Sequence, residues 1–316
     1  MSFKIVNYND NLFNEWDNFI KISINGTIYQ TRKFLSYHDK NKFLDSSILI
    51  YKNEILSCVL PSCKLGENFF SHKGATYGGP VFSKEVYNIK NMDEILNLIF
   101  SYYDNKIEFR IPNSIYHEYS DNILLYLLGS KLKMCPELAW YISVEDDVIN
   151  NIKNIRNKKS VIKMINNENY TCQKFTEKED YISYYEILLK NLKEKYNTNP
   201  THTLTEFLLL KEILLNNQSL YLVKKENIIY GGVFVIKVTK NCWYTFYISK
   251  NIDINNNMSI IYIMNKIKED AKKENVKYID YGITTENSGK ILNKGLSEFK
   301  ELSLCGKSTN RYLFLK

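Results

Sequence analysis

Two side chains that could take part in polar chemistry lie near the C-terminal end of the chain, Asp280 and Lys300. Asp280 falls at the end of a strand that we expect at Tyr278–Tyr281. A carboxylate in such a place can orient an amine or accept a proton from it, and it can equally well cap the turn that follows. Lys300, taken by itself, is typical of a solvated surface lysine.

A second group of candidates surrounds the glycine-rich segment 71–80, which contains His72 and Tyr77. Its three glycines would let the backbone approach a ligand closely. No Gly-Lys-Ser/Thr follows and no helix is expected to begin there, so the segment is not a phosphate-binding loop. We expect most of the four histidines to be structural.

Aromatic and basic residues supply weaker candidates. Tyr244 and Tyr247 lie among apolar neighbours along Trp243–Ile248, where a tyrosine either contacts a ligand or packs in a sheet. Arg156 stands beside two lysines and could bind phosphate, although a charged helix face explains the same pattern.

Composition limits the class of protein. The 316 residues are 44% hydrophobic and 24% charged, as in ordinary globular proteins, and the net charge of +7 favours anionic partners such as nucleotides, phosphorylated sugars or RNA. Enrichment in Lys, Asn and Ile accounts for that charge without any ligand. The six cysteines show no CxxC spacing, so we expect reduced, packed thiols and no metal site. No apolar run approaches the roughly 20 residues of a membrane span.

Hydrophobic periodicity predicts an alternation of helices and strands. The expected helices are Leu12–Ile22, Thr31–Asp39, Asp93–Tyr103, Tyr119–Leu132, Asp146–Asn167, Lys178–Tyr196, Thr201–Asn216 and Met258–Lys273. The expected strands are Phe3–Val6, Ile48–Tyr51, Ile55–Cys63, Phe69–Phe82, Ile107–Ile111, Ala139–Val144, Tyr170–Phe175, Leu220–Val223, Ile228–Val238, Trp243–Ile248, Tyr278–Tyr281 and Arg311–Leu315. We expect Thr31 and Thr203 to cap helices, the latter with Glu206 in a capping box, and Asp93 and Glu94 to lie in a first helical turn.

The same order of elements occurs twice, over Ser47–Ile107 and over Ser219–Tyr278. Each half is predicted to hold two helices followed by a mostly antiparallel sheet with a late crossover helix, which is an α+β fold. We predict one domain over 1–148, a second over 149–310, and a terminal strand over 311–316 that can return to the first domain. A duplicated unit also predicts a ligand cleft between similar halves.

The segment 278–300, with Asp-Tyr-Gly at 280–282, Gly-Leu at 295–296 and Phe299-Lys300, resembles the end of the second GNAT domain in Fem-type (FemAB/FemX-like) transferases. Weaker matches are Gln30–His38, Ser71–Pro80 and Ile155–Ser160, so the resemblance covers almost the whole chain. It implies two tandem GNAT-like (acyl-CoA N-acyltransferase) domains. The chain departs from the family after Lys300, where Glu301-Leu302-Ser303-Leu304 replaces the common ending, and at His38, where the family often has a lysine.

The resemblance also implies an activity, which is transfer of an aminoacyl or acyl group to an amine of a peptidoglycan or other cell-envelope glycan precursor. Lys300 would then stabilise the tetrahedral oxyanion and Asp280 would act on the amine. Phe299, Tyr247, Tyr244, His72, Tyr77, His38 and Arg156 would contact substrates. We expect the second copy to supply the catalytic groups and the first copy to form part of the acceptor site.

The implied partners are an anionic acceptor, such as a nucleotide-linked glycan precursor, and a donor that is either charged tRNA or an acyl thioester, with no tightly bound cofactor and no DNA. Neither copy has the glycine-containing loop that grips coenzyme A before the crossover helix, since residues 253–259 and 87–93 lack glycine. The N-terminus lacks a signal-peptide core, which favours a cytoplasmic location with peripheral attachment at the inner membrane face left open. Two alternatives remain: a CoA-dependent N-acetyltransferase acting on a nucleotide-linked amino sugar, and a non-catalytic scaffold that binds RNA or a nucleotide.

Overall fold

The structure is a computed structural model that describes residues 3–38, 42–254, 256 and 258–316. The end of the predicted helix at Asp39 lies outside the described residues. Two compact units divide the chain. Unit 1 comprises residues 1–137, 286–291 and 310–316, and unit 2 comprises residues 138–285 and 292–309. The junction predicted near residue 148 therefore falls within unit 2, and the last residues of the chain belong to unit 1.

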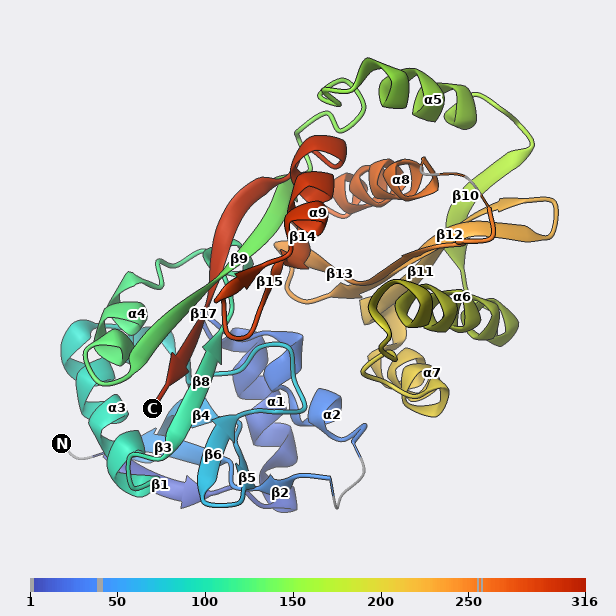
Figure 1. Ribbon diagram of the computed structural model, residues 1–316. Coiled ribbons are helices and arrows are strands. Elements are labelled where there is room, and N and C mark those ends of the chain that lie inside the picture. The colour runs from blue at the N-terminus through green and yellow to red at the C-terminus, as the bar shows by residue number, and fades with distance from the viewer. Residues whose placement is uncertain (1–2, 39–41, 255, 257) are drawn as a thin grey trace. The chain divides into compact units, whose positions relative to one another are not determined.

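Unit 1 combines short strands with four α-helices among its described residues (Figure 1). Its helices are α1 (Phe13–Ile22), α2 (Arg32–Leu35), α3 (Ile89–Tyr102) and α4 (Asn122–Gly129). Its strands are β1 (Phe3–Asn7), β2 (Leu44–Asp45), β3 (Ile48–Lys52), β4 (Ile55–Leu60), β5 (Cys63–Leu65), β6 (Asn68–Ser71), β7 (Val81–Phe82) and β8 (Ile107–Ile111). The strands β1, β3, β4 and β7 form one sheet in that order.

Unit 2 contains strands of one extended sheet and, among its described residues, five α-helices. Its helices are α5 (Ile155–Ile165), α6 (Lys178–Tyr196), α7 (Leu204–Leu214), α8 (Ser259–Lys273) and α9 (Lys294–Glu298). Its strands are β10 (Tyr170–Phe175), β11 (Gln218–Lys225), β12 (Ile228–Lys237), β13 (Cys242–Lys250) and β14 (Tyr278–Ile283). Four strands have residues in both units: β9 (Lys133–Ser143), β15 (Thr285–Glu286), β16 (Ile291–Leu292) and β17 (Lys307–Leu315).

The sheet of unit 2 is covered on both faces. Figure 1 shows α8 along one face of strands β11 to β13 and α6 with α7 along the other. Alternation along the strands explains this, because successive side chains of β12 point to opposite faces. Val233 and Val235 join the core that contains Ile260 and Met264 of α8, whereas Phe234 packs against the α6 and α7 side. The α+β class with mostly antiparallel strands is confirmed.

Both units contain a short parallel strand pair around their late crossover helix. In unit 1, β6 pairs with β8 from Phe69↔Ile107 to Ser71↔Phe109, on either side of α3 in the sequence. In unit 2, β13 pairs with β14 from Cys242↔Tyr278 to Tyr244↔Asp280, on either side of α8. A parallel connection of this kind requires a crossover, which the helix provides. The repeat seen in the sequence is therefore present in the structure.

Several predicted boundaries are wrong for local reasons. The helix predicted from Asp93 begins at Ile89, because Asn88 is its N-cap and accepts a hydrogen bond from Asn91 N. Asp93 and Glu94 consequently lie beyond the first turn. The helix predicted from Asp146 begins at Ile155, since Asp147 holds the preceding segment in a turn by accepting from Asn150 N at 2.9 Å.

The strand predicted at Phe69–Phe82 is two strands, β6 and β7, separated by the glycine-rich segment. The strand predicted at Ile55–Cys63 is likewise divided, into β4 and β5. All six cysteines are free thiols. Within the described residues, no helix has both the length and the apolar character needed to span a bilayer.

Candidate active site

The end of β14 carries Asp280 in a buried, bent part of the strand. Asp280 is fully buried, and its Oδ1 accepts a hydrogen bond from Gly282 N at 2.6 Å. Gly282 has a φ of +76°, and the register of β14 with β9 shifts between Asp280 and Gly282. A glycine tolerates this left-handed backbone without strain. The carboxylate therefore holds the bend of the strand and remains close to the residues described next.

Lys300 occupies the place where the pairing of β13 with β14 ends. The Thr245 hydroxyl donates to the carbonyl oxygen of Asp280 at 3.0 Å, just beyond the last paired residues. The Nζ of Lys300 then donates to the carbonyl oxygens of Gly282 at 3.1 Å and Ile283 at 3.0 Å. Beyond the last residues of β14 that pair with β13, the backbone carbonyls therefore accept hydrogen bonds from the side chains of Thr245 and Lys300.

A π-helical turn, Phe299–Ser303, aims Lys300 at β14. It continues directly from α9, and Leu304 N donates to Phe299 O at 3.2 Å, five residues back. Gly306 N donates to Lys300 O at 2.8 Å, which ties the turn to the chain that follows. A π turn widens the helix by one residue and changes the direction of its side chains, and such turns are frequent at functional sites.

Burial controls the charge of Lys300. Lys300 is 4% exposed, and this burial lowers the pKa of its ammonium to about 8. The negative charge of Asp280 acts in the opposite direction and raises the pKa, but by less. A cation in such a setting interacts strongly with any negative charge that forms beside it. The arrangement suits an amine that stabilises a developing oxyanion near neutral pH.

Aromatic side chains cover the same strand ends. A Cβ atom at Gly282 would lie 2.9 Å from the Tyr244 hydroxyl, so this ring packs directly over the glycine. The Tyr244 ring contacts Phe246 at 5.9 Å between centroids, and Phe246 contacts Tyr247 at 4.8 Å. The structure thus brings Tyr244 together with the Asp280 and Lys300 end of β14, and Tyr247 lies further along β13.

His202 is a residue that sequence reasoning did not single out. Its Nδ1 lies 2.8 Å from the Tyr247 hydroxyl, and its backbone N donates to the same oxygen at 3.3 Å. The Tyr185 hydroxyl donates to His202 O at 2.8 Å. Burial raises the pKa of Tyr247 to about 12, so it stays a neutral phenol. The only signal in the sequence was the position of His202 directly before the Thr203–Glu206 capping box, which the structure confirms.

Phe299 and Arg156 are the other predicted residues of unit 2. Phe299 is half-buried and packs against the core beneath α8, beside Lys300 in the π turn. Arg156 is exposed on α5. The geometry at the strand ends is set by Asp280, Lys300 and Tyr244.

Two histidines of unit 1, His38 and His72, form a cluster around Gly74. His38 Nε2 lies 2.6 Å from Gly74 O, and Gly74 N donates to His72 Nδ1 at 3.0 Å. The two imidazole rings are nearly parallel, with centroids 6.3 Å apart. Burial lowers the pKa of His72 to about 4, so this ring is neutral at physiological pH. Tyr77 is only 1% exposed and packs against the rings of Tyr29 and Tyr116.

The glycine-rich segment fills the corresponding strand ends of unit 1. Gly78 N donates to Arg110 O of β8 at 2.8 Å, and Gly79 N donates to Ser71 O of β6 at 3.2 Å. A Cβ at Gly78 would lie 1.4 Å from Ser71 O, so only glycine fits. The backbone of this segment therefore joins β6 to β8 beyond their paired residues, where unit 2 has Thr245 and Lys300 instead.

A metal centre has no support in the described part of the chain, where no group of three His, Cys, Asp or Glu side chains is arranged to hold an ion.

Comparison with known proteins identifies the fold. No protein-family model and no curated protein sequence matches the chain. Among solved structures, FemX superposes with a TM-score of 0.70 at 12% identity, covering 99% of this chain and 97% of FemX. The chain has the Fem-like duplicated GNAT fold.

Two further solved structures share this GNAT architecture. A tandem GNAT protein from the clavulanic acid biosynthesis pathway has a TM-score of 0.57 at 7% identity, covering 99% of this chain and 97% of that one. The C-terminal domain of a putative lysylphosphatidylglycerol synthetase from Agrobacterium fabrum has a TM-score of 0.55 at 11% identity, covering 85% of this chain and 83% of that one. At these identities, the similarity establishes the GNAT fold alone.

Proposed function

We propose that unit 2 transfers an acyl or aminoacyl group to an amine, forming an amide on a peptidoglycan or other cell-envelope glycan precursor. The observation that carries the proposal is the buried ammonium of Lys300, held by two carbonyl oxygens at the open end of β13 and β14. The Fem-like fold supports it, as does the similarity to a protein named as a lysylphosphatidylglycerol synthetase, which by its name joins an aminoacyl group to an acceptor.

The chemistry follows from the positions of these groups. The neutral amine of the acceptor attacks the carbonyl carbon of the donor ester or thioester, and the carbonyl oxygen takes the negative charge. The Lys300 ammonium, which uses two N–H donors on Gly282 and Ile283, has a third to offer to that oxygen. The amide forms as the ester or thioester bond breaks. The proton lost by the amine passes to the leaving oxygen or sulfur, with Asp280 as its temporary acceptor.

Donor and acceptor are tested together with purified protein. Nucleotide-linked muropeptide precursors and nucleotide-linked amino sugars are incubated with a mixture of charged tRNAs or, separately, with acyl-coenzyme A, and products are detected by mass spectrometry. We expect an amide product with one donor class. Binding of the acceptor without any product from either donor would contradict the proposed transfer.

The role of Lys300 is tested with three variants. Lys300→Ala should lower kcat by about 10²-fold or more, the usual effect of removing one oxyanion donor. Lys300→Arg should retain part of the rate and should lose the alkaline decline of kcat that a pKa of about 8 imposes on the wild type. Lys294→Ala is the control, because Lys294 is exposed at the start of α9. A Lys300→Ala variant that keeps the full rate would refute this role.

A further inference from the structure

Residues 148–167 hold most of the net positive charge of the chain. The segment contains no acid and five cations, namely Lys153, Arg156, Lys158, Lys159 and Lys163. The whole chain has 42 cations and 35 acids, so all other residues together have 37 cations and 35 acids. Charge is therefore nearly balanced over the rest of the chain and is concentrated at α5, which lies within this segment.

The cations of this segment are accessible to a partner outside the chain. Four of the five are exposed, and Lys158 is half-buried. Within the part of the chain that the structure describes, none of the five forms a salt bridge. The nearest acids in the sequence, Asp147 and Glu168, lie at the two ends of the segment. The positive charge of α5 is therefore not neutralised by the chain itself.

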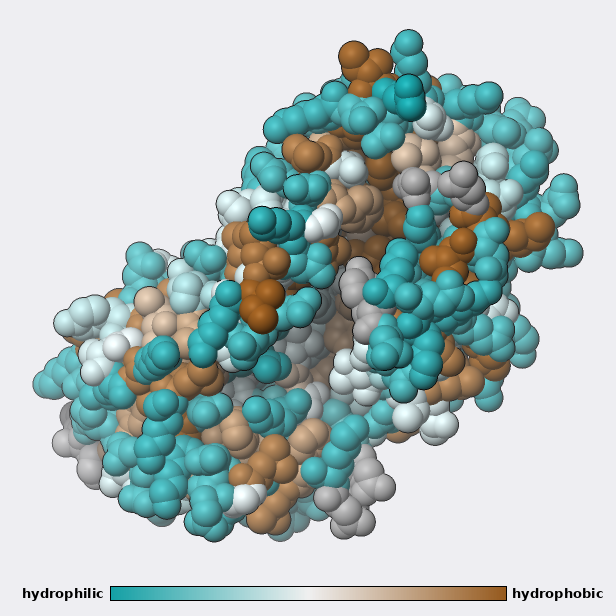
Figure 2. All heavy atoms as spheres, viewed as in Figure 1, coloured by the Kyte–Doolittle hydropathy of each residue, from teal (hydrophilic) through white to brown (hydrophobic). Residues whose placement is uncertain are grey.

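Two exposed isoleucines lie among these cations. Ile155 is 69% exposed and Ile162 is 37% exposed. They are seven residues apart in α5 with Lys159 between them at helical spacing, so the three side chains form one row along the helix. Figure 2 shows mostly hydrophilic atoms over α5, with hydrophobic atoms exposed beside them. The α5 surface is this row with the surrounding cations, that is, Lys153, Ile155, Arg156, Lys158, Lys159, Ile162 and Lys163.

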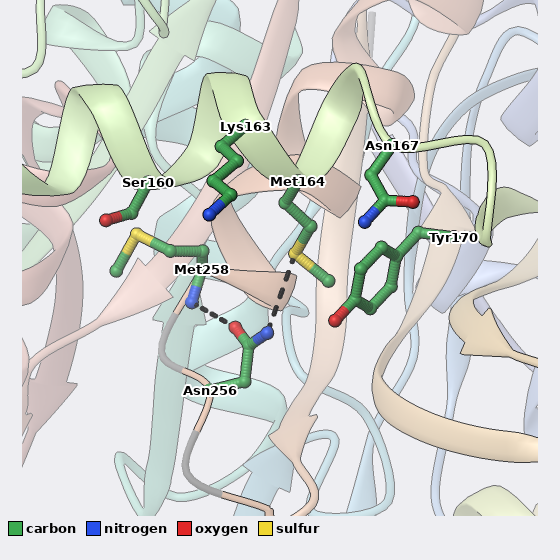
Figure 3. A pocket seen from close by; sticks show the side chains of 7 residues that line it. All are labelled: Ser160, Lys163, Met164, Asn167, Tyr170, Asn256 and Met258. Carbon is green, nitrogen blue, oxygen red and sulfur yellow. Dashed lines mark hydrogen bonds between the residues drawn. The ribbon is translucent and has the colours of Figure 1, made fainter.

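The other side of α5 packs on unit 2. Val161 is fully buried in the core of the unit, and Met164 is 5% exposed in the same core. The Met164 sulfur lies 3.8 Å from Asn256 Nδ2 at a pocket of about 330 Å³ (Figure 3). Ile162 precedes Met164 by two residues, which is about 200° around the helix. The isoleucine row therefore faces away from the pocket, and α5 has one side for packing and another for a partner.

We propose that the α5 surface docks on a lipid bilayer that contains anionic lipids. The cations lie among the anionic headgroups, and the isoleucine row enters the boundary between headgroups and acyl chains. Both contributions are needed, because the strength with which a surface helix binds a bilayer depends on the buried apolar area and on the attraction to anionic lipids. The proposal concerns binding only and is independent of the proposed transfer reaction.

Two other partners fit the α5 surface less well. Single-stranded RNA is bound by cations together with aromatic side chains on which the bases stack, and residues 148–167 contain no aromatic residue. A second copy of this chain would place five cations against five cations, and like charges repel. Neither partner would remove Ile155 and Ile162 from water as well as an acyl-chain boundary does. An anionic bilayer satisfies the cations and the isoleucines together.

Co-sedimentation of the purified full chain with lipid vesicles tests this proposal. Vesicles of equal parts phosphatidylcholine and phosphatidylglycerol are compared with vesicles of phosphatidylcholine alone. We expect binding to the anionic vesicles only, and we expect it to weaken as the salt concentration rises from about 0.1 M to about 1 M, because salt screens the attraction. Absence of binding to the anionic vesicles would overturn the proposal, and so would equal binding to both kinds of vesicle.

Variants of the α5 surface locate the contact. Lys159→Gln should lower the partition coefficient by about fivefold, which corresponds to about 1 kcal/mol per basic residue at an anionic surface. Ile155→Gln should lower it by about tenfold or more, since an apolar side chain no longer enters the bilayer. The matched controls are Lys193→Gln on α6, at an exposed lysine, and Ile22→Gln on α1, at an isoleucine that is 82% exposed. Controls that lose as much binding as the α5 variants would contradict the assignment.

Fluorescence quenching provides a second measurement. The three native tryptophans, Trp16, Trp140 and Trp243, are all buried. Lipids with brominated acyl chains should therefore quench the indole introduced by Ile162→Trp and leave the emission of the wild type unchanged. A vesicle-bound Ile162→Trp variant without this quenching would place the contact elsewhere and overturn the proposal. Binding of a short single-stranded RNA by a chain that does not bind anionic vesicles would overturn it as well.

Discussion

Lys300 combines burial with a charge, and no carboxylate among the described residues forms a salt bridge with it. Its Nζ donates hydrogen bonds to the two backbone carbonyl oxygens of Gly282 and Ile283, which are neutral acceptors. Neutral acceptors satisfy the N–H groups without removing the cost of desolvation. This residue therefore makes the folded state less stable while it is protonated.

The pKa of Lys300 predicts how stability changes with pH. Its folded value of about 8 lies below the ordinary 10.5, so the unfolded chain binds the extra proton between these pH values. The free energy of unfolding should therefore rise as pH increases from 8 to 10.5, by at most about 3 kcal/mol, and the full penalty should be present below pH 8. Urea unfolding of the wild type and of Lys300→Met, compared at pH 7 and pH 10.5, measures this difference. Parallel profiles for the two proteins would show that the lysine is not buried as a cation.

A side chain at Gly282 should lower stability for two reasons, the positive φ of the backbone and the closeness of Tyr244. Gly282→Ala would place a Cβ on a backbone with φ of +76° and 2.9 Å from the Tyr244 hydroxyl. We expect a loss of about 1–2 kcal/mol in the free energy of unfolding, together with a lower rate because Tyr244 must move. Gly295→Ala is the control, since nothing lies within 4 Å of its Cβ position in α9. It should be neutral or stabilise the helix by up to about 1 kcal/mol.

The bounds of helices with a long periodic pattern or a clear capping residue could be predicted closely from the sequence. The long helix Lys178–Tyr196 matches α6 at both ends, and the caps at Thr31 and Thr203 are confirmed. The pattern of α6 is periodic over many residues, so a single competing interaction does not move it.

The candidate site was harder to predict because tertiary contacts decide its geometry. Asp280 and Lys300 were named from the sequence, but the π turn that directs Lys300 depends on a hydrogen bond from Gly306 N to Lys300 O. His202 reaches Tyr247 only because α7 packs against β13, and no spacing in the sequence reports that contact. Local patterns also did not predict that residues 78–79 join β6 to β8, since they indicated a strand over Phe69–Phe82 whose glycines let the backbone approach a ligand.

Gly78 joins the ends of β6 and β8 in unit 1, so replacing it should destabilise that unit. Gly78→Ala would place a Cβ 1.4 Å from the Ser71 carbonyl oxygen, a backbone atom that cannot move without disturbing β6. We expect at least about 3 kcal/mol of destabilisation, at the upper end of overpacking. Gly66→Ala, at φ +58° in open space, should cost only about 1 kcal/mol from backbone strain. Equal effects of the two changes in thermal or urea unfolding would contradict the bridging role.

In the whole molecule, residues from both ends of the sequence complete unit 1. Phe314 is fully buried in the core that also contains Ile107, Phe109 and Leu128. Arg311 donates from Nε to the Glu137 carboxylate at 2.6 Å, and both side chains are buried. Unit 2 is therefore inserted within the sequence of unit 1 rather than following it.

Phe314 should accordingly control the stability of unit 1. Phe314→Ala is expected to lower the free energy of unfolding of unit 1 by about 3–5 kcal/mol, because it leaves a cavity in a closed core. Limited proteolysis with mass mapping should then show the first cuts within residues 1–137. Removal of Lys316 alone, an exposed residue, serves as the control and should change nothing. First cuts within residues 138–285 would contradict this assignment of the core.

This arrangement has a consequence for synthesis on the ribosome. Translation delivers residues 1–137 first, yet the last strand of that unit, with Phe314, emerges after every residue of unit 2 has been made. Domains generally fold as units once their residues are available. Unit 2 can therefore fold while the nascent unit 1 still has a gap in its core. The part of the chain that is translated first is the part that finishes folding last.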